Sequence, residues 1–533
     1  MSHISGAVQS DTYDPVPEVT AEIFDRLSAV VGAEWIISDT EALRDYRDPY
    51  GVPGDEQYSP SIAVLPRTVE QIQGILRIAN DTGIPVWTHS QGRNNGYGGP
   101  SPRVGGSITI SLRQMNRVLE INEELAYAVV EPGVRWFDLH EALRARGSAL
   151  MVSVPDLGWG SVVGNSLDNG VTYLPNGSDF QAPTGMEVVL ADGDVVRTGM
   201  GAIPESKSWH LYKRGLGPVL DPLFMQSNYG IVSKMGVWLM PAPEAYAPLR
   251  LTIASDSDLG AAIDCIRTLR LRGVLCGVPS LYNTLMAATM TGQAAVIAAA
   301  ELALMPEDQI QQAAESTGLG RWYVRAALWG DRVVVDHQIN VATELWTAIP
   351  GARITVPGIY APDEYGQIES ISDRITVGIP NLDVLRHKGD SFGHIGFSPI
   401  VPLTGQEVSD VVDMLREEIE QATGQNFKCG ILVLNDRACA VVSSINFDPR
   451  IEYEARAAYA TARQLVAKSG ARGYGEYRAH LDFMDVATDQ FSFNNMAFRR
   501  LCEKIKDALD PKGILSPGRY GIWPTAMRSH RHE

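Results

Sequence analysis

The chain has 533 residues, of which 45% are apolar and 20% charged, and its formal net charge is −18. This length exceeds what one hydrophobic core usually supports, so the sequence predicts at least two domains. The acidic balance, with an isoelectric point near 5.1, argues against binding to nucleic acid or to an anionic membrane surface. No apolar run is long enough to cross a bilayer, and the first residues lack a signal-peptide pattern, so we expect an untargeted cytoplasmic protein. The five cysteines form no C-x-x-C pair, which argues against a metal site or a disulfide framework.

Strands and helices alternate in the first part of the chain. Residues 61–66 predict a short buried strand, and Thr68 with Gln71 predicts a capping box for a helix over residues 69–83. Residues 84–88 predict a second strand, while residues 106–112, 117–122 and 126–133 predict further strands of a mixed sheet before a helix over 136–146. A hairpin is expected at Asp192-Gly193, and a last strand ends before Pro241. We expect this α/β pattern to continue to about residue 243.

The composition changes after residue 244. Longer amphipathic helices are predicted over residues 258–273 and 407–424, and strand-like runs such as residues 437–446 separate them. Residues 509–518 predict a turn-rich loop near the C-terminus. The change predicts a second domain in the middle of the chain.

Two glycine-rich segments lie in the first part. "HSQGRNNGYGG", residues 89–99, directly follows a predicted strand, and "PDLGWGSVVGNSLDNGVTYLPNG" covers residues 155–177. Glycine lets backbone N–H groups approach a phosphate closely, although each segment alone also fits a structural turn. The spacing of Gly158, Gly160 and Gly164 is one residue too long for the G-x-G-x-x-G fingerprint, which argues against a Rossmann site. Together, the two segments indicate a dinucleotide whose pyrophosphate lies between two loops.

Seven segments carry a resemblance to a known family: "GRNNGYGGPSPRVGGSI", "VEPGV", "PDLGWGSVVGN", "EVVLADGDVVRTGMGA", "SNYGIVSKMG", "GYGEYRAH" and "KDALDPKGILSPGRYGIW". They resemble the vanillyl-alcohol oxidase family, nearest to eugenol oxidase and bacterial 4-alkylphenol oxidases. The resemblance implies an α+β fold of two domains. An FAD-binding domain would comprise residues 1–243, a mixed α/β substrate cap domain residues 244–474, and residues 475–533 would return to the FAD domain and active site.

The resemblance also implies which residues contact FAD. They come from both glycine-rich segments, from one strand and from the C-terminal loop, and they are Ser90, Gly92, Arg93, Asn94, Asn95, Pro155, Gly160, Ser161, Gly164, Asn165, Val232 and Arg519. A solitary histidine such as His394 is often a hydrogen-bonded structural residue. Its surrounding "GHIGFSP" resembles the family segment whose histidine bonds the flavin covalently, and such a bond raises the reduction potential.

The chain departs from the family at several positions. Ser372 stands where some relatives place an arginine, with Arg374 nearby, and residues 435–439 read Asn-Asp-Arg-Ala-Cys in place of a basic, histidine-rich run. Leu174 and Asn176 replace a threonine and a tyrosine. These departures leave open what stabilises the reduced flavin and predict a different local specificity.

A phenol site is implied by Tyr97, Tyr477 and Arg478, which match the two tyrosines and the arginine that hold a phenolate in the family. Taken alone, each tyrosine fits a packed aromatic side chain. Asp156 matches the acidic residue beside the flavin, which would activate water or take a hydroxyl proton, and Tyr173 would shape the pocket. Without the resemblance, Asp156 reads equally as a turn or helix-cap residue.

The resemblance implies oxidation of para-substituted phenols such as vanillyl alcohol, 4-alkylphenols or 4-allylphenols, with O2 as electron acceptor and hydrogen peroxide as product. A cytochrome-coupled dehydrogenase of the same fold is the alternative, but its flavin is attached through tyrosine, so His394 favours the oxidase. A flavin-binding protein without turnover is a third hypothesis. Relatives form dimers and larger assemblies, which implies a homodimer or higher homo-oligomer.

Overall fold

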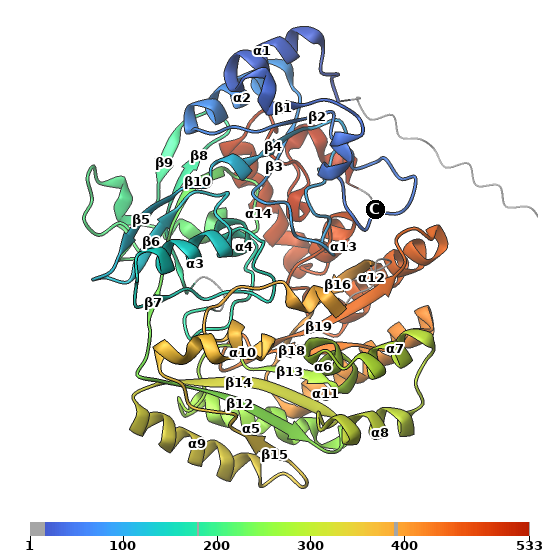
Figure 1. Cartoon of the computed structure of the whole chain (residues 1–533). Coiled ribbons are helices and arrows are strands. Elements are labelled where there is room, and N and C mark those ends of the chain that lie inside the picture. Colours follow the sequence, from blue (N-terminus) through green and yellow to red (C-terminus); the bar gives the residue numbers. More distant parts are fainter. Residues whose placement is uncertain (1–15, 178–180, 388–392, 532–533) are drawn as a thin grey trace, which may run out of the picture.

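The computed structural model describes residues 16–177, 181–387 and 393–531. It mixes helices and sheets in an α+β fold, as expected. Three main sheets form two halves of the molecule, with the two smaller sheets in the upper half of Figure 1 and the largest in the lower half.

The first sheet has four strands in the order β1-β2-β4-β3. Parallel pairing of β2 and β3 with the central β4 leaves their carboxyl ends at one edge. Thr68 caps the intervening helix by accepting a hydrogen bond from the N–H of Gln71, and Gly83 ends that helix in the left-handed conformation, as the sequence predicts. The elements are α1 (Ala21–Val31), β1 (Ile36–Ile37), β2 (Ile62–Val64), α2 (Val69–Thr82), β3 (Val86–His89) and β4 (Ile108–Ser111).

The second sheet is antiparallel, in the order β5-β6-β10-β8-β9. The single mixed sheet expected from the sequence is therefore wrong: the expected strand over 106–112 joins the first sheet, whereas those over 117–122 and 126–133 form a hairpin that pairs with β10. Periodicity identifies strands but not their partners. The elements are β5 (Val118–Asn122), β6 (Tyr127–Val130), α3 (Trp136–Ala145), α4 (Val162–Leu167), β8 (Pro183–Val189), β9 (Val195–Arg197) and β10 (Ile231–Trp238), with a small pair of β7 (Leu150–Met151) and β11 (Met240–Pro241).

The third sheet has eight strands and lies in the middle segment of the sequence. Helices α5, α9, α11 and α12 bury their apolar faces against it in one continuous core. Its strands are β12 (Ala245–Ile253), β13 (Ser280–Asn283), β14 (Trp322–Gly330), β15 (Arg353–Thr355), β16 (Gly393–Phe397), β17 (Ile400–Pro402), β18 (Cys429–Leu432) and β19 (Ala438–Phe447). Its helices are α5 (Leu259–Leu271), α6 (Thr284–Thr291), α7 (Ala294–Leu302), α8 (Glu307–Thr317), α9 (Arg332–Trp346), α10 (Ile371–Ile375), α11 (Gly405–Thr423) and α12 (Glu452–Ala471).

The C-terminal segment packs among the first two sheets, with α13 (Met484–Asp489) and α14 (Phe493–Leu509). The N–H of Ser516 donates to the carbonyl of Val86, and the N–H of Val86 donates to that of Ile514, so this segment extends the edge of β3. The buried pair of Lys506 and Asp510, 2.8 Å apart, supports the same loop. Residues more than 400 positions apart in sequence thereby meet along β3. The predicted domain boundaries at residues 243 and 474 stay a prediction.

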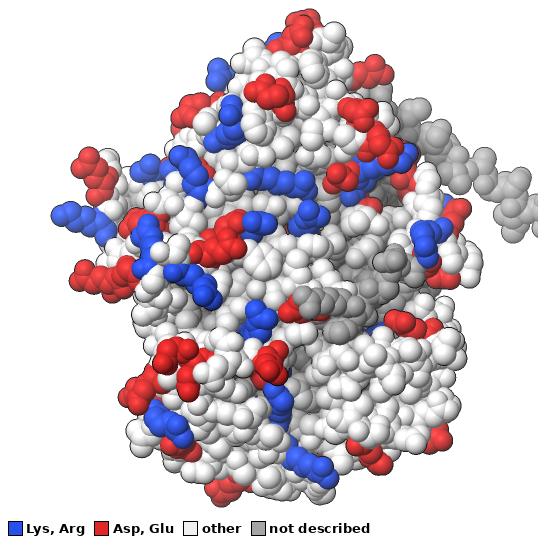
Figure 2. Space-filling view, in the orientation of Figure 1, with Lys and Arg blue, Asp and Glu red and all other residues white. Residues whose placement is uncertain are grey.

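Acidic and basic side chains are interspersed on the face that Figure 2 shows. Among the described residues, no helix is long and apolar enough to cross a membrane. The N-terminal residues on which the absence of a signal peptide is predicted lie largely outside the described residues.

Candidate active site

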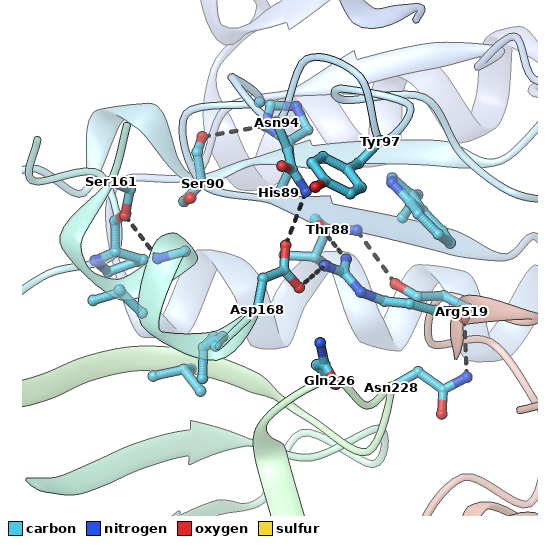
Figure 3. Close-up of a pocket in the computed structure, with 18 of the residues that line it drawn as sticks. Thr88, His89, Ser90, Asn94, Tyr97, Ser161, Asp168, Gln226, Asn228 and Arg519 are labelled. Atoms are coloured by element: carbon cyan, nitrogen blue, oxygen red, sulfur yellow. Dashed lines mark hydrogen bonds and ion pairs between the residues drawn. The ribbon is translucent and has the colours of Figure 1, made fainter. Parts of the chain in front are cut away.

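One cavity lies between the two glycine-rich segments and the C-terminal loop (Figure 3). Twelve of the predicted site residues line it: Ser90, Gly92, Arg93, Asn94, Tyr97, Gly160, Ser161, Gly164, Asn165, Val232, Arg478 and Arg519. The other predicted residues, Asn95, Pro155, Asp156, Tyr173, His394 and Tyr477, are not among the described residues of its wall. The structure therefore brings most of the predicted cofactor and phenol residues to a single space.

The two glycine-rich segments touch each other at Gly164. A Cβ atom at this position would overlap the Oγ of Ser90, so the absence of a side chain allows the contact. Ser161 begins α4: its hydroxyl donates to the carbonyl of Pro132 at 2.5 Å and accepts from the N–H of Gly164 at 2.9 Å. The first segment, the second segment and the loop before α3 are thereby fixed together.

The first glycine-rich segment, residues 89–99, also contacts the eight-stranded sheet. Gly96 has a φ of +85°, and a Cβ atom there would lie 2.6 Å from the Nε2 of His394, so this close approach requires glycine. The N–H of Gly396 donates to the carbonyl of Gly96 at 3.1 Å, which anchors β16 to the loop. The His394 ring also lies 5.3 Å from that of Tyr50, centroid to centroid. His394 is thus on strand β16 and packs against the loop that carries Gly96.

The cavity wall is suited to a polar cofactor. The side-chain atoms Thr88 Oγ1, His89 Nε2 and Asn228 Oδ1 belong to residues of this wall, are buried, and have no hydrogen-bond partner among the described residues. Buried polar atoms normally have partners, so these atoms call for a ligand with its own donors and acceptors. Burial lowers the pKa of His89 to about 3, which leaves its imidazole neutral. FAD, with its phosphates, ribose hydroxyls and flavin edge, fits this donor and acceptor set.

Arg478 is buried beside two tyrosines. Its guanidinium carbon lies 5.3 Å from the ring centre of Tyr97 and 5.1 Å from that of Tyr477. Burial raises the pKa of the Tyr97 hydroxyl, and nearby tyrosines and Asp168 hold the pKa of Arg478 above its usual value. The site therefore keeps a guanidinium cation beside neutral tyrosine hydroxyls. Such a group can stabilise an added anion. The Tyr477 hydroxyl donates to the carbonyl of Asn169 at 2.8 Å, so the three predicted side chains meet at Arg478.

Asp168 also lines the cavity, and the sequence analysis missed it. Its carboxylate accepts hydrogen bonds from Asn94 Nδ2 at 3.2 Å and from Arg519 Nη2 at 3.3 Å (Figure 3). It also accepts from the Tyr520 hydroxyl at 2.5 Å. A usable signal existed, because Asp168 lies four residues after Gly164 and so falls on the same side of a helix.

A second cluster surrounds Asp156. Its carboxylate accepts from the Tyr173 hydroxyl and from Nη1 of Arg325 at 2.9 Å. Arg325 comes from β14 of the large sheet, and its guanidinium carbon lies 4.0 Å from the ring centre of Tyr173. Burial and the Asp156 charge raise the pKa of Tyr173 well above 10, so this tyrosine stays a hydrogen-bond donor. Arg325 is not among the residues predicted from the sequence, although an arginine inside an apolar strand is a signal of a buried charge with a partner.

The departures from the family pattern have structural positions. Ser372 is buried, and its hydroxyl lies 3.5 Å from Nη1 of Arg325. Arg374 is 3.7 Å from Asp383, outside the residues that line the cavity. Residues 435–437 lie in the turn between β18 and β19, and residues 438–439 begin β19; the Asn435 side chain accepts from the N–H of residues 437 and 438. Leu174 is fully buried in an apolar cluster, and Asn176 donates to the carbonyl of Trp238 at 3.2 Å.

Residues 60–199 match the FAD binding domain family. The chain is 32% identical over 504 residues to the flavoprotein subunit of 4-cresol dehydrogenase (hydroxylating) from Pseudomonas putida, covering 93% of this chain and 94% of that protein. It is 30% identical over 503 residues to 1'-carboxy-chondrochloren decarboxylase from Chondromyces crocatus, covering 87% and 91%.

Solved structures give the same result. A 4-ethylphenol oxidase from Gulosibacter chungangensis, in complex with isoeugenol, matches with a TM-score of 0.90 and 34% identity over 97% of this chain and 100% of that one. A p-cresol methylhydroxylase with bound substrate matches with a TM-score of 0.86 and 32% identity over 94% and 96%. This chain therefore belongs to the vanillyl-alcohol oxidase family and is an FAD-binding oxidoreductase of the group that acts on 4-alkylphenols.

Proposed function

We propose that this protein is an FAD-dependent oxidase of para-substituted phenols, with vanillyl alcohol, 4-alkylphenols and 4-allylphenols as candidate substrates. The observation that carries the proposal is the position of Arg478 and Tyr97 in the wall of the same cavity as both glycine-rich segments. A phenol bound at Arg478 would therefore share one space with the cofactor. The names of the relatives support the substrate class.

The phenol side would hold the substrate as a phenolate. A free phenol has a pKa near 10, so ionisation at about pH 7 to 8 requires a shift of roughly 2 to 3 units, or about 3 to 4 kcal/mol. The buried guanidinium of Arg478 with the hydroxyl of Tyr97 can supply this difference, because charge-assisted hydrogen bonds are roughly twice as strong as neutral ones. The Tyr477 hydroxyl would join them by turning from the carbonyl of Asn169 to the phenolate. The phenolate then pushes electron density to its para carbon, and loss of a hydride from the benzylic position gives a para-quinone methide.

FAD would be held by the two glycine-rich segments, with Arg519 and Val232 further along the cavity. Bound FAD supplies the acceptor for the benzylic hydride and passes the electrons to O2, which gives hydrogen peroxide. Asp156, fixed by Tyr173 and Arg325, would accept a proton from water that adds to the quinone methide, or from the hydroxyl of a benzylic alcohol.

We further propose that His394 bonds FAD covalently. Its ring packs against Gly96, in the loop whose residues Asn94 and Tyr97 line the cavity, and this contact supports the assignment. Acid precipitation tests it: a covalent flavin stays yellow in the protein pellet, and release of all colour to the supernatant would contradict the assignment. A cytoplasmic homodimer remains our expectation.

Oxidase and dehydrogenase differ in their electron acceptor. The alternative is a dehydrogenase that passes its electrons to a cytochrome, and the similarity to the 4-cresol dehydrogenase subunit favours it. Under air with 4-ethylphenol and no added acceptor, the oxidase predicts peroxide formation matched to substrate loss. Turnover that requires an artificial acceptor and forms no peroxide would identify a dehydrogenase, and failure of phenols to bleach the flavin anaerobically would exclude both.

A further inference from the structure

Asp168 is the junction between the cofactor and phenol sides of the cavity. Its carboxylate accepts from Arg519 and Tyr520 of the C-terminal loop. Its backbone carbonyl accepts two hydrogen bonds from Arg478, from Nη2 at 2.6 Å and from Nε at 3.0 Å. One residue thus fixes two arginines that belong to different parts of the site.

Asn94 completes a closed set of contacts. Its Nδ2 donates to the Asp168 carboxylate at 3.2 Å, and its Oδ1 accepts from Nη1 of Arg478 at 3.3 Å. The first glycine-rich segment, the end of α4 and residue 478 are therefore held in one network, part of which Figure 3 shows. A shift of Asp168 would move groups on both sides.

The backbone around Asp168 supports a specific role. Asp168 ends α4, and the following Asn169 has a φ of +51°, which turns the chain and leaves the Asp168 carbonyl to Arg478. Tyr520 has a φ of +52°, a conformation that non-glycine residues adopt rarely, and its hydroxyl bonds Asp168. Two residues in this uncommon conformation therefore flank the same carboxylate.

The charges show what the carboxylate does. Asp168 faces Arg478, Arg519, Tyr97 and Tyr520, and Glu476 lies close to Arg478. Burial raises the pKa of both tyrosines and brings that of Glu476 to about 8, so near pH 7 these groups are mostly neutral. Asp168 is then the single negative charge against two positive ones among these groups.

We propose that Asp168 is a positioning residue that couples the two sides of the cavity: it orients Arg478 and Arg519 together, and its charge limits how strongly the cavity stabilises an added anion. A bound phenolate and a reduced, negatively charged flavin are both such anions. This inference rests on the proposed function for the phenol and on the family's FAD for the flavin.

Asp168→Asn in the FAD-loaded protein tests the inference, because asparagine keeps an oxygen acceptor and removes the charge. The flavin midpoint potential should rise. Phenol itself, which lacks a benzylic carbon and so binds without turnover, should bind on the order of tenfold more tightly near pH 7, with the pH midpoint of binding moved downward. Wild type and variant share Glu476, so its titration cancels in the comparison. Asp168→Glu should restore both readings toward wild type.

Asp485→Asn is the matched control. Asp485 is a buried carboxylate 2.7 Å from Arg103, and it is not among the residues that line the cavity. Its replacement should lower thermal stability without moving the potential or the pH profile. If Asp168→Asn behaves in the same way, Asp168 is merely structural and the inference is overturned.

The flavin midpoint potential and the pH profile of phenol binding together distinguish failure of this inference from failure of the proposed function. If wild type binds no phenol, the substrate proposal fails, and the potential alone decides the role of Asp168: an unchanged potential overturns it. If wild type binds phenol and the variant's pH profile is unchanged, the coupling is overturned. Should Asp168→Asn lose FAD, Tyr520→Phe replaces it: without the hydroxyl donor the carboxylate field is stronger, so the potential should fall, and an unchanged or raised potential would overturn the inference.

Discussion

Replacement of Arg478 by alanine tests the proposed phenolate site most directly. Arg478 is 8% exposed and lies beside Tyr97 and Tyr477 in a region from which most water is excluded. Two unit charges about 4 Å apart at an effective dielectric constant near 20 interact by roughly 4 kcal/mol, which corresponds to about 3 pKa units. Loss of this charge would therefore remove most of the shift needed to ionise a phenol near neutral pH.

The expected result is a loss of phenol affinity on the order of tenfold at pH 8, with little residual dependence on pH between about 6 and 9. Wild type should instead bind phenol more tightly as pH rises through the pKa of the bound phenol. The assay is a titration of the flavin absorbance with phenol at several pH values. Arg437→Ala, which removes a surface arginine that is 80% exposed, is the control for loss of charge alone.

Truncation also leaves the Asp168 carbonyl and Asn94 without their donor. Arg478→Lys separates the loss of charge from the loss of these hydrogen bonds, since lysine keeps the charge but cannot make all of the bonds. It should retain the pH dependence of phenol binding with weaker affinity. Unchanged affinity and pH profile in Arg478→Ala would refute the phenolate site.

Three further predictions concern the loop, a buried acid and the C-terminal support. Gly96→Ala would place a Cβ atom 2.6 Å from His394 Nε2 at a φ of +85°, so we expect loss of acid-stable flavin; full retention in the acid pellet would argue against close packing there. Glu476 has a pKa raised from 4.5 to about 8 by burial, so the unfolded state releases this proton first as pH rises, and folded-state stability falls between those values. Glu476→Gln should make the melting temperature less dependent on pH between about 5 and 8 in thermal unfolding, and an equally steep decline would contradict the assignment. Lys506→Met leaves the carboxylate of Asp510 buried without its cation, at a cost of about 3 to 5 kcal/mol, which denaturant unfolding would measure. Adding Asp510→Asn, which removes the charge but keeps an oxygen acceptor for the N–H groups of Ile514 and Leu515, should recover part of that loss, and no recovery would mean that the unpaired charge is not the cause.

The sequence alone determined the local elements well where one short-range rule governs them. Thr68, Gln71 and Gly83 set the ends of α2 through capping and left-handed termination, which depend only on neighbouring residues. The two glycine-rich segments also predicted close approaches of the backbone. The family resemblance implied FAD as the cofactor and phenols as the substrate class.

Only the tertiary structure decided which of these elements meet. Residue periodicity does not encode pairings between distant segments. Three such pairings are the division of the early strands into a four-stranded and a five-stranded sheet, the return of residues 514–516 to β3, and the approach of His394 to Gly96. The sequence marks Asp168 by its spacing from Gly164 and Arg325 by its place in an apolar strand, but neither signal identifies a partner. Each acquires its role through burial against partners from elsewhere in the chain, where a charge is retained because it is paired.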